Sequence, residues 1–284
     1  MRILVTGAAG FTGRTLVPLL LEKGYNVFPM DRVSSGFPGE IIADLSDDGL
    51  IDTLNALQSV DVVVHLGTRV GWDGGTSADL FKPNVLATGI LAGWAQRQGA
   101  HFIFASAALI AGERETHITA QRGVNTSNDY LYGKWLAEEL IRVSGVHHTH
   151  LRISGIFGKG GPFHLGLNRA IASALEGKPP VQYGVGKIKR NYIYVKDLCE
   201  VILHCIRSIK TSKPMEGVQM VGGREGITIA RMLQDICDIL LPGTNPEVRE
   251  GNGGYDQIVE VSSLLPKGRA FREAILDIRA ELNK

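Results

Sequence analysis

Tyr130 and Lys134 are the two side chains in this sequence best placed to exchange a proton with a substrate. On a helix, residues four apart share one face. A tyrosine has an ordinary pKa of about 10, and a nearby ammonium group favours the phenolate and lowers that pKa. A tyrosine so activated can act as an acid or a base towards a substrate hydroxyl. The same spacing occurs in ordinary surface pairs, so the meaning of this pair depends on its surroundings.

A glycine-rich turn near the N-terminus supplies those surroundings. Gly7, Gly10 and Gly13 lie between the first predicted strand and the first predicted helix. In that context the first glycine permits a tight turn, the second lets the backbone approach a pyrophosphate, and the third lets the helix pack closely. Phe11 and Thr12 lead into the helix, whose first turn offers free N–H groups to phosphates. The turn therefore predicts binding of a nicotinamide dinucleotide.

The preferred dinucleotide depends on the end of the second predicted strand. Asp31 lies there, 18 residues after Gly13. A carboxylate at this place accepts hydrogen bonds from the adenosine ribose and repels a 2′-phosphate, which favours NAD. The adjacent Arg32 could hold that phosphate instead, so NADP is the less favoured alternative.

The elements that position these residues alternate along the chain. Apolar runs predict strands at residues 2–6, 26–31, 40–43, 61–65, 101–105 and 149–153, with helices at 12–23, 50–58, 84–98 and 130–143. Apolar strands separated by helices imply a parallel sheet covered on both faces. We predict an α/β fold with a Rossmann-type, doubly wound parallel sheet. Its dinucleotide-binding domain spans residues 1–157 with returning segments around 187–210, and a smaller substrate-binding lobe fills most of 158–284.

Over nearly its whole length, the chain resembles the extended short-chain dehydrogenase/reductases of the NAD-dependent epimerase/dehydratase family, nucleotide-sugar 4-epimerases in particular. Besides the turn and the Tyr-x-x-x-Lys pair, the similar segments are Asp44-Leu45, His65-Leu66-Gly67, Asn84-Val85, Leu151-Arg152, Phe157-Gly158 and Arg190 to Asp197. The resemblance implies that Tyr130 and Lys134 are catalytic and contact the cofactor. It implies further cofactor contacts at Asp44, Leu45, Leu66, Gly67 and Asn84. It places Arg190 on the diphosphate of a sugar nucleotide, where a guanidinium can donate a bidentate pair.

The sequence departs from the family pattern at the catalytic hydroxyl. The family places a serine or threonine five residues before a glycine after the fifth strand, and here Ala107 occupies that position relative to Gly112. Ser106 is one residue early, and neighbours on a strand face opposite ways. A one-residue shift would let Ser106 serve as this catalytic hydroxyl and contact the substrate, and we expect it to lie near the site without ideal placement. Another residue or a water is the alternative source of the hydroxyl.

The same stretch bears on the reaction. Sugar-nucleotide 4,6-dehydratases carry an Asp-Glu pair here, for which this sequence has Ala108 and Leu109. A 4-epimerase needs only reversible hydride transfer and an acid/base. The favoured prediction is an NAD-dependent epimerase of a UDP-sugar. The alternatives are a dehydrogenase or reductase of a sugar or other carbonyl compound, and a dinucleotide-binding regulatory protein with impaired catalysis.

Composition and charge bear on the partners and the location of the protein. The net charge of +1 over 284 residues gives no support for a nucleic-acid or membrane partner. Three cysteines without C-x-x-C spacing do not suggest a zinc site or a disulfide framework, and no metal is expected. No apolar run approaches the roughly 18 residues of a membrane span. We expect a cytoplasmic protein, and the family resemblance suggests a homodimer.

Overall fold

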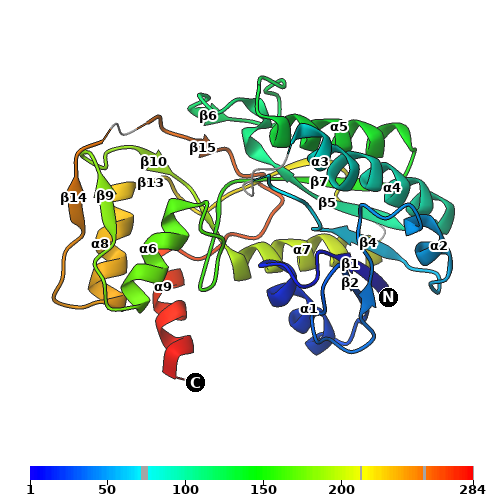
Figure 1. Cartoon of the computed structure of the whole chain (residues 1–284), viewed down its shortest axis with the longest axis horizontal. Helices are drawn as coiled ribbons and strands as arrows, with labels where there is room; N and C mark the ends of the chain where they lie inside the picture. Colours follow the sequence, from blue (N-terminus) through cyan, green and yellow to red (C-terminus); the bar gives the residue numbers. More distant parts are fainter. Residues whose placement is uncertain (72–75, 212, 252–253, 284) are drawn as a thin grey trace. The chain divides into compact units, whose positions relative to one another are not determined.

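The computed structural model describes residues 1–71, 76–211, 213–251 and 254–283. The chain divides into two compact units (Figure 1). The first unit comprises Met1–Gly112, Gly123–Arg152 and Cys199–Gln219, and the second comprises Glu113–Arg122, Ile153–Leu198 and Met220–Lys284. Residues 153–157 and 187–198 belong to the second unit, and the segment returning to the first unit is Cys199–Gln219.

A seven-stranded sheet organises the first unit. Its order is β12-β7-β5-β4-β1-β2-β3. The strands are β1 (Arg2–Thr6), β2 (Asn26–Asp31), β3 (Ile41–Ile42), β4 (Val62–His65), β5 (His101–Ala107), β7 (His148–Ile153) and β12 (Gly217–Val221). β1 pairs in parallel with both β2 and β4, and the β2–β3 and β4–β5 pairs are also parallel. The strand order reverses between β1 and β4, the kind of switch point at which open α/β sheets bind ligands.

Helices cover both faces of this sheet, as Figure 1 shows. One face carries α3 (Ser77–Phe81), the π-helix η1 (Lys82–Leu86), α4 (Ala87–Gln98) and α5 (Asp129–Val143), and α2 (Leu50–Asn55) packs with α4. The other face carries α1 (Gly13–Glu22) and α7 (Val195–Lys210). The core between the sheet and the first set is filled by large apolar side chains such as Trp94, Phe102 and Phe104. Burial on both faces explains why the strands have near-continuous apolar sequences.

The second unit combines helices with short strand pairs. Its helices are α6 (Gly166–Leu175), α8 (Ile229–Leu240), α9 (Phe271–Ala280) and the 3₁₀ turn η3 (Glu281–Asn283). Its strand pairs are β6 (His117–Ile118) with β15 (Ile258–Val259), β8 (Ile156–Phe157) with β11 (Ile193–Tyr194), β9 (Val181–Tyr183) with β14 (Glu247–Arg249), and β10 (Lys189–Arg190) with β13 (Ile227–Thr228). Short strands of two or three residues carry little sequence periodicity, so most of them were not predicted.

The fold class is confirmed, and the differences from prediction are local. The helix predicted over 84–98 begins earlier, in the π-helical turn at Lys82. The weak third strand shrinks to Ile41–Ile42, which pairs with Met30 and Asp31 at the edge of the sheet. The sequence analysis did not predict α6. None of the described helices is long and apolar enough to cross a membrane.

Candidate active site and dinucleotide cradle

The glycine turn is shaped so tightly that side chains are excluded at two positions. Gly7 has a φ of +71°, and a Cβ there would lie 2.6 Å from the backbone nitrogen of Gly67. A Cβ on Gly13 would overlap with the carbonyl oxygen of Gly7. The amide of Gly10 donates to that same carbonyl at 3.0 Å. The start of α1 is thereby held close to the ends of β1 and β4, which fits the cradle that a dinucleotide pyrophosphate requires.

Asp31 lies beside this turn. Its Oδ2 accepts a hydrogen bond from the amide of Ala9 at 3.0 Å, and its Oδ1 lies 3.4 Å from the amide of Val33. The carboxylate is partly exposed and keeps lone pairs for a further ligand, while Arg32 is exposed. The geometry therefore fits a ribose contact by Asp31, as the sequence predicts.

The segment after β4 completes the wall of the cradle. The amide of Gly67 donates to the Thr6 hydroxyl at 3.2 Å. A Cβ on Gly67 would lie 2.7 Å from Leu45, so Leu45 packs directly on this glycine. Asp44 is exposed and accepts from the amide of Ser46 at 2.7 Å, which forms the turn that presents Leu45. Leu66 is partly exposed beside them. The structure thus gathers Asp44, Leu45, Leu66 and Gly67 near the turn.

His65 serves the packing of this region. Its Nδ1 lies 2.6 Å from the Thr6 hydroxyl and its Nε2 lies 2.9 Å from the Thr88 hydroxyl. Burial lowers the pKa of His65 to about 3, so the ring is neutral at physiological pH. His65 joins β4 to β1 and α4 through its neutral ring.

Asn84 is bonded to the loop that follows β4. Its Oδ1 accepts from the amide of Arg69 at 2.7 Å, and its Nδ2 donates to the carbonyl of Arg69 at 2.7 Å. It also accepts from the hydroxyl of Thr68 at 3.1 Å. The side chain is buried. Asn84 therefore positions this loop through three hydrogen bonds, and its predicted cofactor contact stays a prediction.

Tyr130 and Lys134 lie at the start of α5, as predicted. Asn128 caps this helix, because its side-chain oxygen accepts from the amide of Leu131 at 3.1 Å. The Nζ of Lys134 lies 5.8 Å from the centre of the Tyr130 ring. Tyr130 is partly buried, and the Thr68 hydroxyl hydrogen-bonds its phenol group. The sequence analysis did not single out Thr68, because a lone threonine after a strand carries no spacing signal.

Desolvation moves the two pKa values in opposite directions. It raises the pKa of Tyr130 to about 12 and lowers the pKa of Lys134 to about 7. In both cases burial disfavours the charged form. Lys134 is 3% exposed and donates to the carbonyl of Ala105 at 2.8 Å. The phenolate that acid/base chemistry requires therefore needs added positive charge or hydrogen-bond donors near Tyr130.

Ser106 turns away from the role that the sequence suggested. Its hydroxyl donates to Glu138 at 2.5 Å. Glu138 is buried and paired with Arg152, whose Nη2 lies 2.7 Å from a carboxylate oxygen. Strand alternation explains the orientation, because Ser106 faces the interior while Ala107 faces the more open side. The catalytic and substrate contacts predicted for Ser106 stay untested, but the hydroxyl is occupied by a structural bond.

The sequence analysis did not single out Glu138, although its spacing from Lys134 could have indicated a role beside that lysine. It lies four residues after Lys134 on the buried face of α5, and its negative charge raises the pKa of Lys134 against the effect of burial. A buried acid at helical spacing from a predicted catalytic lysine is a recognisable pattern.

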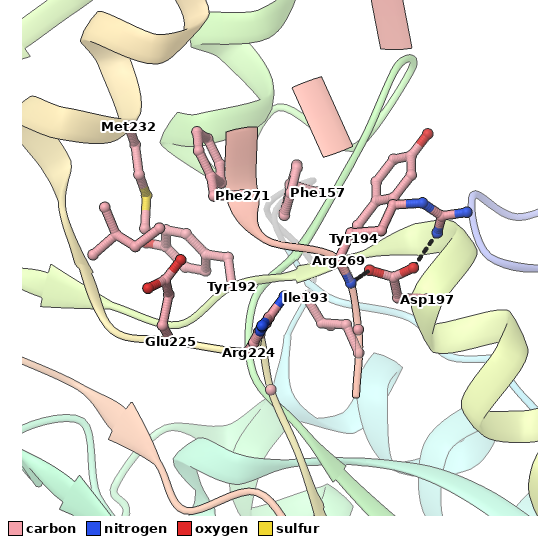
Figure 2. Close-up of a pocket in the computed structure, with 14 residues that line it drawn as sticks. Phe157, Tyr192, Ile193, Tyr194, Asp197, Arg224, Glu225, Met232, Arg269 and Phe271 are labelled. Carbon is pink, nitrogen blue, oxygen red and sulfur yellow. Dashed lines mark hydrogen bonds and ion pairs between the residues drawn. The ribbon is translucent and has the colours of Figure 1, made fainter. Parts of the chain in front are cut away.

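Arg190 belongs to the second unit. Its guanidinium donates to the carbonyl oxygens of Lys189 and Tyr255 and hydrogen-bonds the phenol of Tyr192. The same unit contains a pocket, shown in Figure 2, to which Tyr192 contributes. Its wall includes apolar side chains of Phe157, Met232 and Phe271, and the ion pair of Arg269 with Asp197. Arg190 is partly exposed.

These features define a class of protein. A doubly wound sheet with a glycine cradle, an acidic residue at the end of β2, and a Tyr-x-x-x-Lys pair on a helix beside β5 is the arrangement of an extended short-chain dehydrogenase/reductase. Residues 3–220 match the model of the NAD dependent epimerase/dehydratase family. The chain belongs to this family of enzymes. The cofactor of the family is NAD, the dinucleotide that Asp31 favours.

Individual relatives agree with that assignment. The chain is 27% identical over 222 residues to a putative UDP-glucose 4-epimerase of Methanocaldococcus jannaschii, covering 71% of this chain and 72% of the relative. It is 26% identical to the uncharacterized UDP-glucose epimerase YtcB of Bacillus subtilis, covering 84% and 82%. Its fold is similar to that of the UDP-glucose 4-epimerase of Thermotoga maritima, solved with UDP-glucose, with a TM-score of 0.84, 21% identity and full coverage of both chains.

Proposed function

We propose that this protein is an NAD-dependent 4-epimerase of a UDP-sugar, with Tyr130 as the acid/base. The observation that carries the proposal is the placement of Tyr130 and Lys134 on α5. Relatives and structural neighbours named as UDP-glucose, UDP-glucuronic acid or UDP-N-acetylglucosamine 4-epimerases support this choice of substrate. Ala108 and Leu109, where a dehydratase would carry an acidic pair, argue against water elimination.

The chemistry divides between the cofactor and the chain. Bound NAD would supply the reversible hydride transfer. Tyr130 removes the proton of the sugar hydroxyl at the reacting carbon and later returns it to that oxygen. Lys134 stabilises the phenolate by its positive charge and holds the nicotinamide ribose. Arg190 binds the diphosphate, and Asp31 binds the adenosine ribose.

Incubation of the purified protein with NAD and single UDP-sugars tests the proposal. Separate reactions with UDP-glucose, UDP-glucuronic acid and UDP-N-acetylglucosamine are analysed by chromatography for the C4 epimer. We expect one of them to be converted, and Tyr130→Phe to lower kcat at least about 100-fold because it removes the acid/base. Tyr132→Phe, an exposed tyrosine on the same helix, is the matched control and should retain activity.

Two outcomes would overturn the epimerase assignment. Net formation of NADH with a sugar substrate would identify a dehydrogenase, since an epimerase produces none overall. Absence of any epimer from every nucleotide sugar tested would contradict the proposal altogether. A regulatory protein that only binds the dinucleotide would show binding of NAD without turnover, and Ala107 is the residue that favours that alternative.

A further inference from the structure

The loop after β4 brings a hydroxyl group to the proposed acid/base. Thr68 lies two residues beyond Leu66 and hydrogen-bonds the phenol of Tyr130. Thr68 is exposed. On β5, the position where the family carries the hydroxyl is Ala107, and the Ser106 hydroxyl is bonded to Glu138. Among the described residues, Thr68 supplies the hydroxyl group that bonds this phenol.

Hydrogen bonds with Asn84 set the orientation of the Thr68 hydroxyl. Asn84 binds both the N–H and the carbonyl of Arg69, so its oxygen and nitrogen are unambiguously assigned. Its Oδ1 can only accept, and the Thr68 hydroxyl therefore donates to it at 3.1 Å. The lone pairs of Thr68 remain available to accept a hydrogen bond from the neutral phenol of Tyr130. Asn84 is buried, so these bonds tie the loop to the interior of the first unit.

The same hydroxyl can serve the deprotonated tyrosine. When Tyr130 loses its proton, the Thr68 hydroxyl can rotate and donate to the phenolate oxygen. The oxygen of Asn84 then keeps its bond from the Arg69 amide, so no buried acceptor is left unpaired. A donor to the charged form stabilises that form, and the Thr68 bond indeed opposes the rise in the pKa of Tyr130 that burial causes.

We propose that Thr68 is a positioning residue for Tyr130 that orients its neutral phenol and stabilises its phenolate, supplying from the β4 loop the hydroxyl that β5 lacks. The inference rests on the proposed function in one respect, the role of Tyr130 as acid/base. Its physical content, a hydrogen bond that favours the phenolate, can be measured without any sugar.

The other charged groups around Tyr130 set the background for that measurement. Asp129, Lys134 and Glu138 share its helix, and Arg69 follows Thr68 in the loop. The elements packed against α5 are α3, η1, α4, β5 and the 3₁₀ turn η2 (Ala108–Ala111). They contribute the ionisable residues Asp79, Lys82, Arg97 and His101. Asp79 is bonded to Thr76, Lys82 to Asp48 and His101 to Thr149. Substitution at Thr68 removes no charge and leaves this background unchanged.

The test follows the ionisation of Tyr130 by NMR in the full chain. Protein labelled with ¹³C at the tyrosine Cζ is titrated in the presence of NAD and without sugar, and Tyr130→Phe identifies the Tyr130 signal. We expect Thr68→Val to raise the midpoint of Tyr130 by about one pH unit or more, since hydrogen bonds to charged groups are among the stronger ones. Thr68→Ser, which keeps the hydroxyl, should titrate like the wild type. Thr53→Val, a partly buried threonine on α2, is the control for the Thr→Val change.

Each possible result decides the proposal. An unchanged midpoint in Thr68→Val overturns it, and so does an equal change in Thr68→Ser, because the hydroxyl would then not be the cause. If Tyr130 does not ionise before the protein unfolds, its Cζ shift at pH 8 decides, with a change expected in Thr68→Val alone and no change overturning the proposal. Failure to find an epimerase activity would leave these readings intact, so the two proposals fail separately.

Discussion

At the scale of single residues, Lys134 shows how burial and function oppose each other. A lysine that is 3% exposed loses most of its hydration, and burial lowers its pKa from 10.5 to about 7. Glu138, four residues further along the same buried face, counteracts this by favouring the ammonium form. The pKa of Lys134 therefore lies near neutral pH, where the side chain can gain or lose its proton.

This residue predicts a rise in stability at alkaline pH for the ligand-free protein. Between pH 7 and 10.5 the unfolded lysine holds a proton that the folded one has lost, so the free energy of unfolding increases with pH. The increase is at most about 1.4 kcal/mol per pH unit. Urea unfolding at pH 7, 8 and 9 should show it in the wild type and not in Lys134→Met. Lys267→Met, at an exposed lysine, should keep the wild-type slope. Parallel slopes in Lys134→Met and the wild type would refute this view of Lys134.

At the scale of elements, three adjacent strands each bury a histidine. His65 on β4, His101 on β5 and His150 on β7 have pKa values lowered by burial to about 3, 4 and 3. His65 and His101 are bonded to threonine hydroxyls, while the Nε2 of His150 has no hydrogen-bond partner among the described residues. The centre of the sheet therefore depends on neutral imidazole rings.

The buried histidines predict a loss of stability in mild acid. Below pH 6.5 the unfolded histidines take up protons that the folded ones exclude, so the free energy of unfolding falls as the pH is lowered from 6.5 towards 4. Each ring contributes up to about 1.4 kcal/mol per pH unit. His150→Leu should flatten this dependence in urea unfolding at pH 7, 6 and 5, whereas His204→Leu, at an exposed histidine on α7, should not. A His150→Leu variant that loses stability as steeply as the wild type would count against the prediction.

At the scale of the whole molecule, α4 and α5 carry apolar side chains that the monomer leaves exposed. Leu86 precedes α4 and Ile90 lies one turn later on it, and Tyr132 and Val143 lie on α5. Leu140 of α5 lies against Gly89, so the two helices pack closely and present one continuous surface. A surface of this kind agrees with the expectation of a homodimer through these helices.

The dimer can be tested by light scattering coupled to size exclusion. We expect the wild-type chain to have twice the mass of one chain, and Ile90→Asp to shift it towards the monomer because a charge is buried in the interface. Leu276→Asp places the same charge at an exposed leucine of α9 and should leave the dimer intact. A wild-type protein that is monomeric at micromolar concentration would contradict the expectation.

The sequence alone determined the sheet, the glycine cradle and the placement of Tyr130 and Lys134 on one helix, because each depends on local pattern. Apolar runs mark the buried strands, Gly7, Gly10 and Gly13 mark a turn that excludes side chains, and the spacing of Tyr130 and Lys134 places both on one helical face. The residues that make up each of these signals lie within a few positions of one another along the chain. These signals predicted the class of enzyme and its cofactor.

Only the tertiary structure decided which hydroxyl lies beside Tyr130. Thr68 and Tyr130 are 62 residues apart in sequence, and they meet because β4 lies next to β5 and α5 packs on β5. The direction of Ser106 towards Glu138 likewise depends on the pairing of Glu138 with Arg152 across the core. Contacts between distant segments follow from packing, and no spacing in the sequence encodes them.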